Sequence, residues 1–273
     1  MATPKADSYL QSVQFQLSEV EHNYGPNIHI LAHPHLLSLL ATLCSPNTHQ
    51  PVINELIKRI YTSLIDLVAN AEFPRRTVSA PTRMAEFHPE GVYQGVVIDP
   101  TIKVVTVNIA RAGTLPSHVC YEALNYLLPP KQVRQDHISI SRQTDQKDKV
   151  TGSAVFGHKI GGPIDESFIL IPDPMGATGG TLIEVLNLYK DYGRTGKFIA
   201  LHCIVTPEYL KRISEEFPEL TVYAVRLDRG LSLEDVLDTT PGTYWEKERG
   251  LNSKQYIVPG GGGFGEILNN SFV

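Results

Sequence analysis

Apolar positions along the chain follow two periods, one typical of buried strands and one typical of helices. Runs of β-branched and aliphatic residues predict strands at 103–109, 168–171, 198–205 and 221–225. Apolar residues three and four positions apart, together with helix-start signals, predict helices at 51–68, 116–128, 182–189 and 208–217. Strands that alternate with helices in this order predict a parallel sheet and an α/β fold.

The most regular of these helices begins at Pro51, a residue whose fixed φ suits a first helical turn. Its apolar positions recur with the helical period, so they share one face and are expected to be buried. They are Ile53, Ile57, Ile60, Leu64 and Val68.

Three regions depart from the alternation of strands and helices. Residues 1–30 are polar and mixed, and predict an N-terminal extension ahead of one domain at 31–273. Residues 75–100 place Pro and Gly between short β-type runs, which predicts a hairpin arm suited to dimerisation. A short strand is predicted at 137–141, and the polar, charged segment 141–157 after it predicts a mobile loop.

Composition narrows the class of protein. A chain of 273 residues with 42% hydrophobic content can build one large domain with an attached arm. The net charge of −5 disfavours a general nucleic-acid surface, which needs a basic face. Cys44, Cys120 and Cys203 form no C-x-x-C pair, so neither a disulfide framework nor a zinc site is predicted. The first residues lack the apolar core of a signal peptide and no apolar run approaches a membrane span, so the cytoplasm is the expected compartment.

The most informative segment joins the strand at 168–171 to the helix at 182–189. Asp173 follows the strand, and the small residues of 176–181 lead into the helix. Free backbone N–H groups and the positive end of a helix dipole suit a phosphate at such a junction. Thr178 and Thr181 add hydroxyl donors, while Asp173 is placed to bind sugar hydroxyls or a metal-bound substrate. The segment lacks the Gly-Lys-Ser/Thr ending of a nucleotide P-loop.

Two arginines are candidates for binding a second anion. Arg111 follows the strand at 103–109 in a turn of small residues that ends at Gly113. Ligands of parallel α/β sheets bind beyond the carboxyl ends of strands, and a guanidinium offers paired donors to a pyrophosphate. Arg142 opens the basic segment 141–157 and can approach the same anion. A structural ion pair for Arg111 and a solvated charge for Arg142 remain the alternatives.

A glycine run near the C-terminus is the second unusual segment. Gly260, Gly261, Gly262, Gly263 and Gly265 leave backbone groups open to close approach. Main-chain N–H and C=O groups there can form hydrogen bonds with the edge of a flat heterocycle. A flexible tail is the alternative, but the apolar lead-in at 256–258 favours docking.

Three of these segments resemble motifs of the type I phosphoribosyltransferases, and within them the uracil phosphoribosyltransferase family. They are Ile109–Gly113, Asp173–Thr181 and Tyr256–Gly260, and weaker similarity runs from about residue 33 to the end. Purine members usually carry acids where Pro174 and Ala177 stand, which favours the uracil branch. The resemblance implies a parallel-sheet type I phosphoribosyltransferase fold, with a β-hairpin arm at about 75–100, a C-terminal hood at about 229–273, and a homodimer or larger homo-oligomer.

The resemblance also implies a reaction, in which 5-phosphoribosyl 1-pyrophosphate (PRPP) and uracil give UMP and pyrophosphate. Mg²⁺ would be bound through the substrate, with no direct protein ligand. Asp173, Arg111 and Arg142 would be catalytic. The phosphoribosyl group would be bound by Asp173, Met175, Ala177, Thr178, Gly179, Gly180, Thr181, Arg111 and Arg142, and the base by Tyr256, Ile257, Gly260, Gly261 and Gly262.

The hood departs from the family pattern. Gly263 stands where the family usually has a first acid, Glu266 where it has a second, and Ile267 where it has an arginine. Glu266 has a side chain long enough to reach a point similar to that of the missing acid. Two alternatives therefore stay open: a nucleotide-binding regulatory protein with little turnover, and an enzyme for another base.

Overall fold

The computed structural model describes residues 7–144, 150–194 and 196–271. Within them, eight strands form one sheet in the order β1–β10–β9–β7–β4–β5–β6, with the short β8 against β9. Neighbouring strands are parallel, except that β6 runs antiparallel to β5. The predicted α/β parallel-sheet fold is confirmed. The strands are β1 (Ile28–Ile30), β4 (Lys103–Ala110), β5 (Val133–Thr144), β6 (Val150–Lys159), β7 (Ser167–Pro172), β8 (Met175–Gly176), β9 (Lys197–Val205) and β10 (Thr221–Leu227).

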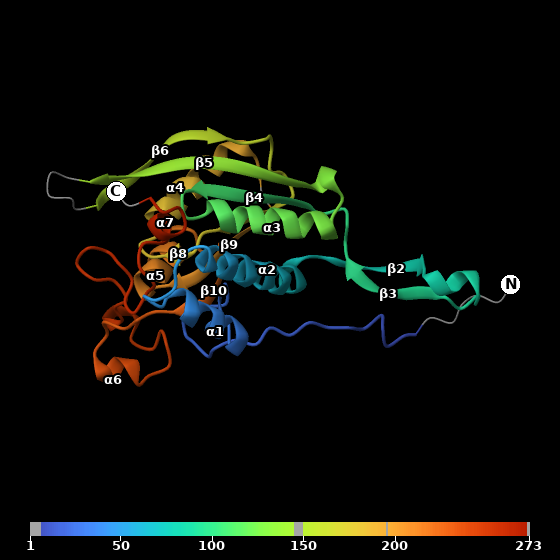
Figure 1. The fold of residues 1–273 in the computed structure, drawn as a ribbon, viewed down its shortest axis with the longest axis horizontal. Helices are drawn as coiled ribbons and strands as arrows, with labels where there is room; N and C mark the ends of the chain where they lie inside the picture. The colour runs from blue at the N-terminus through green and yellow to red at the C-terminus, as the bar shows by residue number, and fades with distance from the viewer. Residues whose placement is uncertain (1–6, 145–149, 195, 272–273) are drawn as a thin grey trace.

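Helices cover both faces of this sheet (Figure 1). One face packs on α1 (Pro34–Leu43), α2 (Val52–Glu72) and α3 (Thr114–Leu127), and the other on α4 (Gly180–Tyr189) and α5 (Pro207–Glu216). Side chains alternate along a strand, so one strand serves two cores. In β9, Leu201 belongs to the core of α2 and Ala200 to the core of α5. The layers bring the carboxyl ends of β4, β7, β9 and β10 to one edge.

The amphipathic face predicted for α2 is confirmed, because all five of its apolar positions are buried. Helix α1 is absent from the predicted elements, although the signals for a helix start are present in its sequence. His33 accepts a hydrogen bond from the N–H of Leu36 at the start of that helix, and Pro34 occupies the first turn. Leu36, Leu40 and Leu43 are buried at helical spacing.

The loop predicted for 141–157 is wrong for the residues that the structure describes. Residues 133–144 and 150–159 form β5 and β6, whose antiparallel pairing runs from His137–Lys159 to Thr144–Val150. Polar composition suggested a loop, but a strand at the edge of a sheet needs backbone pairing rather than apolar side chains on both faces. The sheet also takes in Ile28–Ile30, inside the predicted N-terminal extension, as the edge strand β1.

The predicted hairpin arm is present. Strands β2 (Arg75–Pro81) and β3 (Val92–Ile98) pair antiparallel in their own two-stranded sheet, and the short helix η1 (Arg83–Glu86) lies between them. In Figure 1 the arm projects away from the main sheet. Met84 and Phe87 near its tip are 50% and 68% exposed, so the tip presents apolar surface to its surroundings.

The C-terminal segment docks on the domain and is not a flexible tail in the described residues. It contains α6 (Glu234–Leu237), η4 (Trp245–Lys247) and α7 (Phe264–Ile267). Ile257 and Phe264 are buried in the core formed by α1 and α2. Two other short helices are η2 (Pro130–Gln132) and η3 (Lys190–Tyr192). In the described ranges, no helix is both long enough and apolar enough to cross a membrane.

Candidate functional site

The turn after β7 is fixed by hydrogen bonds to the neighbouring strand β9. The N–H of Asp173 donates to the carbonyl of Leu201 at 3.0 Å, and the Asp173 carbonyl lies 2.6 Å from Nδ1 of His202. The N–H of Met175 lies 3.5 Å from Oδ1 of Asp173. Half-buried Asp173 therefore sits at the carboxyl end of a parallel strand with its main chain fixed.

Two glycines of the turn are required by close packing and by backbone conformation. A Cβ added to Gly176 would lie 2.9 Å from Cγ1 of Val205 and 3.1 Å from the ring of Tyr209. Gly179 has φ +79°, a left-handed conformation that side chains disfavour, and it precedes the first turn of α4. The first N–H groups of a helix have no intrahelical acceptor, and those of α4 follow the half-buried Thr178. The turn thus joins free amide donors to a helix N-terminus.

Arg111 lies beside this turn because β4 pairs with β7. The two loops touch: a Cβ on Gly113 would lie 3.0 Å from the carbonyl oxygen of Pro172, the residue before Asp173. The Arg111 guanidinium is exposed, and its Nη1 donates to the hydroxyl and carbonyl of Ser271 at 2.8 and 3.2 Å. Among the described residues, Arg111 thus makes hydrogen bonds to the C-terminal segment and no ion pair.

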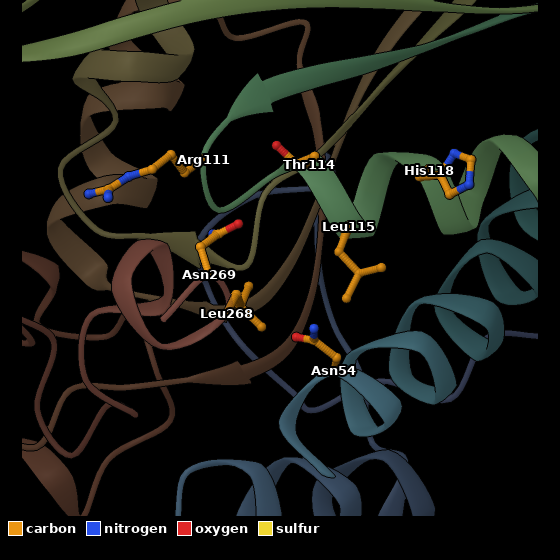
Figure 2. A pocket seen from close by; sticks show the side chains of 7 residues that line it. All are labelled: Asn54, Arg111, Thr114, Leu115, His118, Leu268 and Asn269. Atoms are coloured by element: carbon orange, nitrogen blue, oxygen red, sulfur yellow. The ribbon is translucent and has the colours of Figure 1, made fainter. Parts of the chain in front are cut away.

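A cavity of about 220 Å³ opens next to Arg111, between α2, α3 and α7. Figure 2 shows Asn54, Leu268 and Asn269 on one side of it, with the residues of α3 opposite. The guanidinium of Arg111 points away from Thr114 and His118 in this view. Arg111 therefore contributes to the rim of the cavity, while its charged group faces the other side of the loop.

Arg142 belongs to β5, where its backbone pairs with Ser153 of β6. Its side chain lies outside the described part of the chain, so its predicted contact with an anion stays a prediction.

The glycine segment of the hood is fixed to the carboxyl end of β10 by one ion pair. Oδ2 of Asp228 accepts from the N–H of Gly260 at 2.7 Å, and Nη2 of Arg226 donates to the Gly260 carbonyl at 3.0 Å. Asp228 and Arg226 also bind each other through two bonds of 2.6 and 2.7 Å. Among the predicted base-binding residues, Ile257 is buried and Tyr256 is 43% exposed. The hood thus lies beyond the same sheet edge as the turn after β7.

Three sequence motifs therefore meet at one edge of a parallel sheet. Two of them follow strands β4 and β7, and the third is held at the end of β10. A sequence profile described as Uracil phosphoribosyltransferase matches residues 30–244. The chain belongs to the uracil phosphoribosyltransferase family. This is a family of transferase enzymes, so both the predicted resemblance and the predicted enzyme class are confirmed.

Individual relatives of the family cover most of the chain. It is 29% identical over 247 residues to a uracil phosphoribosyltransferase of Campylobacter fetus subsp. fetus, covering 90% of this chain and 98% of the relative. It is 32% identical over 181 residues to that of Nicotiana tabacum, covering 65% and 67%. Among solved structures, the AQ2163 protein from Aquifex aeolicus shares the fold with a TM-score of 0.68 and 24% identity, covering 90% of this chain and 99% of that one.

The hood of this family member places the carboxylate of Glu266 beside Gly263, the position that lacks the usual acid. Oε2 of Glu266 lies 1.5 Å from the point where a Cβ on Gly263 would stand. Glu266 is half-buried and folds back over the first turn of α7. A carboxylate therefore occupies the volume that a side chain at position 263 would take, even though the residue at 263 is glycine.

Sequence reasoning missed the residues that hold the phosphoribosyltransferase motifs in place. Arg226 and Asp228 clamp the hood, while His202, Thr206 and Tyr209 lie beneath the turn after β7. One signal was available: Thr206 precedes a proline and a helix, which is a helix-cap pattern. The remaining four had no distinctive local pattern, because the segments that they hold in place, at Asp173 and Gly260, are distant in sequence.

Proposed function

We propose that the protein transfers the phosphoribosyl group of PRPP to uracil, giving UMP and pyrophosphate in pyrimidine salvage. The observation that carries the proposal is the contact between the loops of Arg111 and Asp173, through Gly113 and Pro172. It brings the loop that carries a guanidinium for the pyrophosphate beside the loop that carries a carboxylate for the ribose. Family membership and the relatives named for this reaction support the choice of substrates.

In this proposal the 5′-phosphate binds the turn between Ala177 and Thr181, including Gly179 and Gly180. Amide donors there carry partial positive charge at the N-terminus of α4, where an anion is stabilised. Asp173 accepts hydrogen bonds from the ribose hydroxyls, and Met175 lines the turn between them. Arg111 meets the pyrophosphate, and exchanges its bond to Ser271 for the substrate. Arg142 is proposed to meet the same group.

The rate enhancement would come from alignment of the base with the sugar and from stabilisation of the charge that develops on the leaving group. Departure of pyrophosphate leaves positive charge on the ribose and negative charge on the leaving group. Each donor placed on developing charge contributes about 3 kcal/mol to the lowering of the barrier. Holding base and sugar in line removes much of the entropy cost of their meeting. Pyrophosphate is already a fair leaving group, so the proposal needs no covalent intermediate.

Mg²⁺ is proposed to be carried by the pyrophosphate of PRPP, where it would neutralise phosphate charge. Of the residues that the structure describes, no group of three or more His, Cys, Asp or Glu side chains is arranged to hold a metal ion. Phosphate oxygens would then supply most of the ligands that Mg²⁺ prefers.

Uracil is proposed to bind the main chain of the hood, at Tyr256, Ile257 and Gly260–Gly262. A Cβ on Gly262 would meet no atom within 4 Å, so this part of the loop is open to a flat ring. The carboxylate of Glu266 lies where the side chain of the missing acid at position 263 would be, so it can take over the role of that acid. An enzyme for another base stays the alternative, because an acceptor over the glycine loop pairs with any base edge that presents N–H donors.

One assay separates these functions. The purified protein is incubated with labelled PRPP and Mg²⁺, and then with uracil, cytosine, hypoxanthine or adenine in turn. Formation of UMP alone supports the proposed reaction. A nucleotide from another base with none from uracil would replace it with the alternative enzyme. PRPP binding without base-dependent release of pyrophosphate would identify a regulatory protein and overturn the enzymatic proposal.

The protein is also proposed to form a homodimer or larger homo-oligomer through the arm. The apolar tip at Met84 and Phe87 supports this, because an isolated hairpin gains stability when a second surface covers it. Light scattering after size-exclusion chromatography gives the mass in solution. A monomer at micromolar concentration would contradict this part of the proposal.

A further inference from the structure

A buried layer of β9 and α5 lies directly beneath the proposed phosphate turn. His202, Thr206 and Tyr209 are each at most 1% exposed, so none of them faces solvent. Their polar groups all contact main-chain atoms of the turn or one another. None of these bonds is part of a strand pairing or of a helix ladder.

His202 connects one end of the turn to α5. Its Nδ1 lies 2.6 Å from the carbonyl oxygen of Asp173, and its Nε2 lies 2.6 Å from the hydroxyl of Tyr209. A carbonyl can only accept, so Nδ1 carries the hydrogen, and Nε2 of the neutral ring accepts from Tyr209. Burial lowers the pKa of His202 to about 4, against the opposing effect of the bond to the Asp173 carbonyl, and this keeps the ring neutral.

Thr206 holds the other end of the turn. Its main-chain N–H donates to the carbonyl of Gly176 at 3.1 Å, and its hydroxyl donates to the carbonyl of Ala177 at 2.7 Å. The same hydroxyl oxygen accepts from the N–H of Tyr209 at 3.0 Å, as the cap of α5. One side chain thus joins the start of α5 to the turn.

The bond from Thr206 sets the direction of an amide donor. The carbonyl of Ala177 and the N–H of Thr178 belong to one trans peptide plane and point in opposite directions. Drawing the carbonyl toward Thr206 therefore aims the Thr178 N–H away from the buried layer. Nη1 of Arg212 lies 3.4 Å from the carbonyl of Thr178, and so constrains the next plane, which carries the N–H of Gly179.

We propose that Thr206, Tyr209 and His202 are positioning residues that aim the donors of the turn at the 5′-phosphate and fix Asp173 at the ribose. The inference rests on the proposed function, because it takes the turn to be the phosphoribosyl site. The three residues act through the main chain of Asp173 and Ala177 and do not touch the substrate. Loss of the Thr206 hydroxyl leaves the Ala177–Thr178 plane free to rotate.

The test compares Thr206→Val with Thr206→Ser in the full-length protein. Valine keeps the shape and removes the hydroxyl, whereas serine keeps the hydroxyl. We expect Thr206→Val to raise the Kd for ribose 5-phosphate and the KM for PRPP about tenfold, the effect of one misdirected donor to a charged group. In Thr206→Ser the same Kd and KM should stay within about twofold of their wild-type values. In Thr206→Val kcat should change less than KM, because phosphate binding is shared by the ground state and the transition state.

Tyr223→Phe is a matched control for buried hydroxyl loss. Tyr223 is 1% exposed and its hydroxyl donates to Glu72 at 2.7 Å, away from the turn. Melting temperatures establish that each variant is folded. If Thr206→Val does not fold, Tyr209→Phe replaces it, since it removes only the hydroxyl that His202 accepts from; it too should weaken ribose 5-phosphate binding, while Tyr223→Phe should not.

The outcomes separate this inference from the proposed function. Wild-type ribose 5-phosphate affinity in a folded Thr206→Val, or an equal loss in Thr206→Ser, overturns the positioning role. Weakened ribose 5-phosphate binding in Thr206→Val, restored by serine, supports it even in a protein that forms no nucleotide. In that last case the proposed reaction fails and the positioning of the turn stands.

Discussion

The carboxylate of Asp228 accepts a hydrogen bond from the main-chain N–H of Gly260 at 2.7 Å, across 32 residues of sequence. The guanidinium of Arg226 binds the same carboxylate and also the Gly260 carbonyl. One ion pair therefore holds both polar groups of a glycine with φ +61°. Because Asp228 is only 2% exposed, the clamp is a buried link between the sheet edge and the hood.

We expect Asp228→Ala to loosen the hood and to leave Arg226 without its counter-charge. Removing one partner of a buried pair costs about 3 kcal/mol of unfolding free energy. The KM for the base should rise about tenfold or more, since the glycine loop loses its anchor. Denaturation and initial-rate measurements give the two quantities.

Asp136→Ala is the matched control for this clamp. Arg134 and Asp136 form an ion pair with the same i, i+2 spacing on β5, and Asp136 is fully buried. Asp136→Ala should destabilise the protein about as much as Asp228→Ala does, but it should leave the KM for the base unchanged. Equal KM changes in both variants would show that the hood responds to stability alone.

Asp173→Asn should reduce kcat by about a hundredfold, the scale of one electrostatic contact to the transition state. Asparagine is isosteric and keeps an Oδ1 acceptor for the N–H of Met175, so the turn should keep its shape. Steady-state kinetics with saturating PRPP and base give the change, and circular dichroism monitors the fold. Near-normal turnover would remove Asp173 from the reaction.

Gly179→Ala should weaken PRPP binding and destabilise the fold. The left-handed φ of +79° costs an L-residue about 1 kcal/mol of unfolding free energy. Gly25→Ala is a matched control, because Gly25 has φ +108° with no atom within 4 Å of an added Cβ. Both variants should lose stability, and only Gly179→Ala should raise the KM for PRPP. A PRPP effect in Gly25→Ala would point to a global cause.

Gly263→Ala should displace the Glu266 carboxylate, because the new Cβ would lie 1.5 Å from its Oε2. We expect a change of at least about threefold in the ratio of kcat/KM between uracil and another base, since an acceptor leaves the hood. Glu266→Gln, which removes the charge, should shift the ratio in the same direction. Gly265→Ala is the control, since its Cβ would meet no atom within 4 Å. Unchanged ratios in both test variants would exclude Glu266 from base selection.

The neutral state of His202 predicts an acid-sensitive fold. Its pKa falls from the ordinary 6.5 to about 4 in the folded protein through burial, so the unfolded chain binds more protons between these values. Stability from this group is complete above pH 6.5 and is lost as pH falls toward 4. Between pH 7 and pH 5 the loss is about 2 kcal/mol.

His202→Gln tests that assignment, because a glutamine amide can donate to Asp173 and accept from Tyr209 without titrating. Urea unfolding at several pH values should give a shallower acid slope for the variant than for wild type. Parallel slopes would assign the acid sensitivity to other groups of the protein.

Much of the fold could be predicted from short stretches of the sequence. The face of α2 at Ile53 to Val68 and the hairpin arm depend on periodicity and on turn residues, which are properties of near neighbours in sequence. The loop prediction is wrong for the described residues of 141–157 because the backbone pairing of β5 with β6 is not encoded by side-chain polarity alone.

The site divides in the same way. The sequence alone determined the candidates, since Asp173, Gly179 and Arg111 lie in short motifs whose residue types suit an anion and a sugar. Only the tertiary structure decided which contacts support the motifs. Thr206 binds the carbonyl of Ala177, and Asp228 binds the N–H of Gly260. The Glu266 carboxylate fills the space beside Gly263. The first two contacts join residues 29 and 32 positions apart. Such pairs meet only after strand order and packing are set, whereas Glu266 and Gly263 are near in sequence but depend on the side-chain conformation that packing selects.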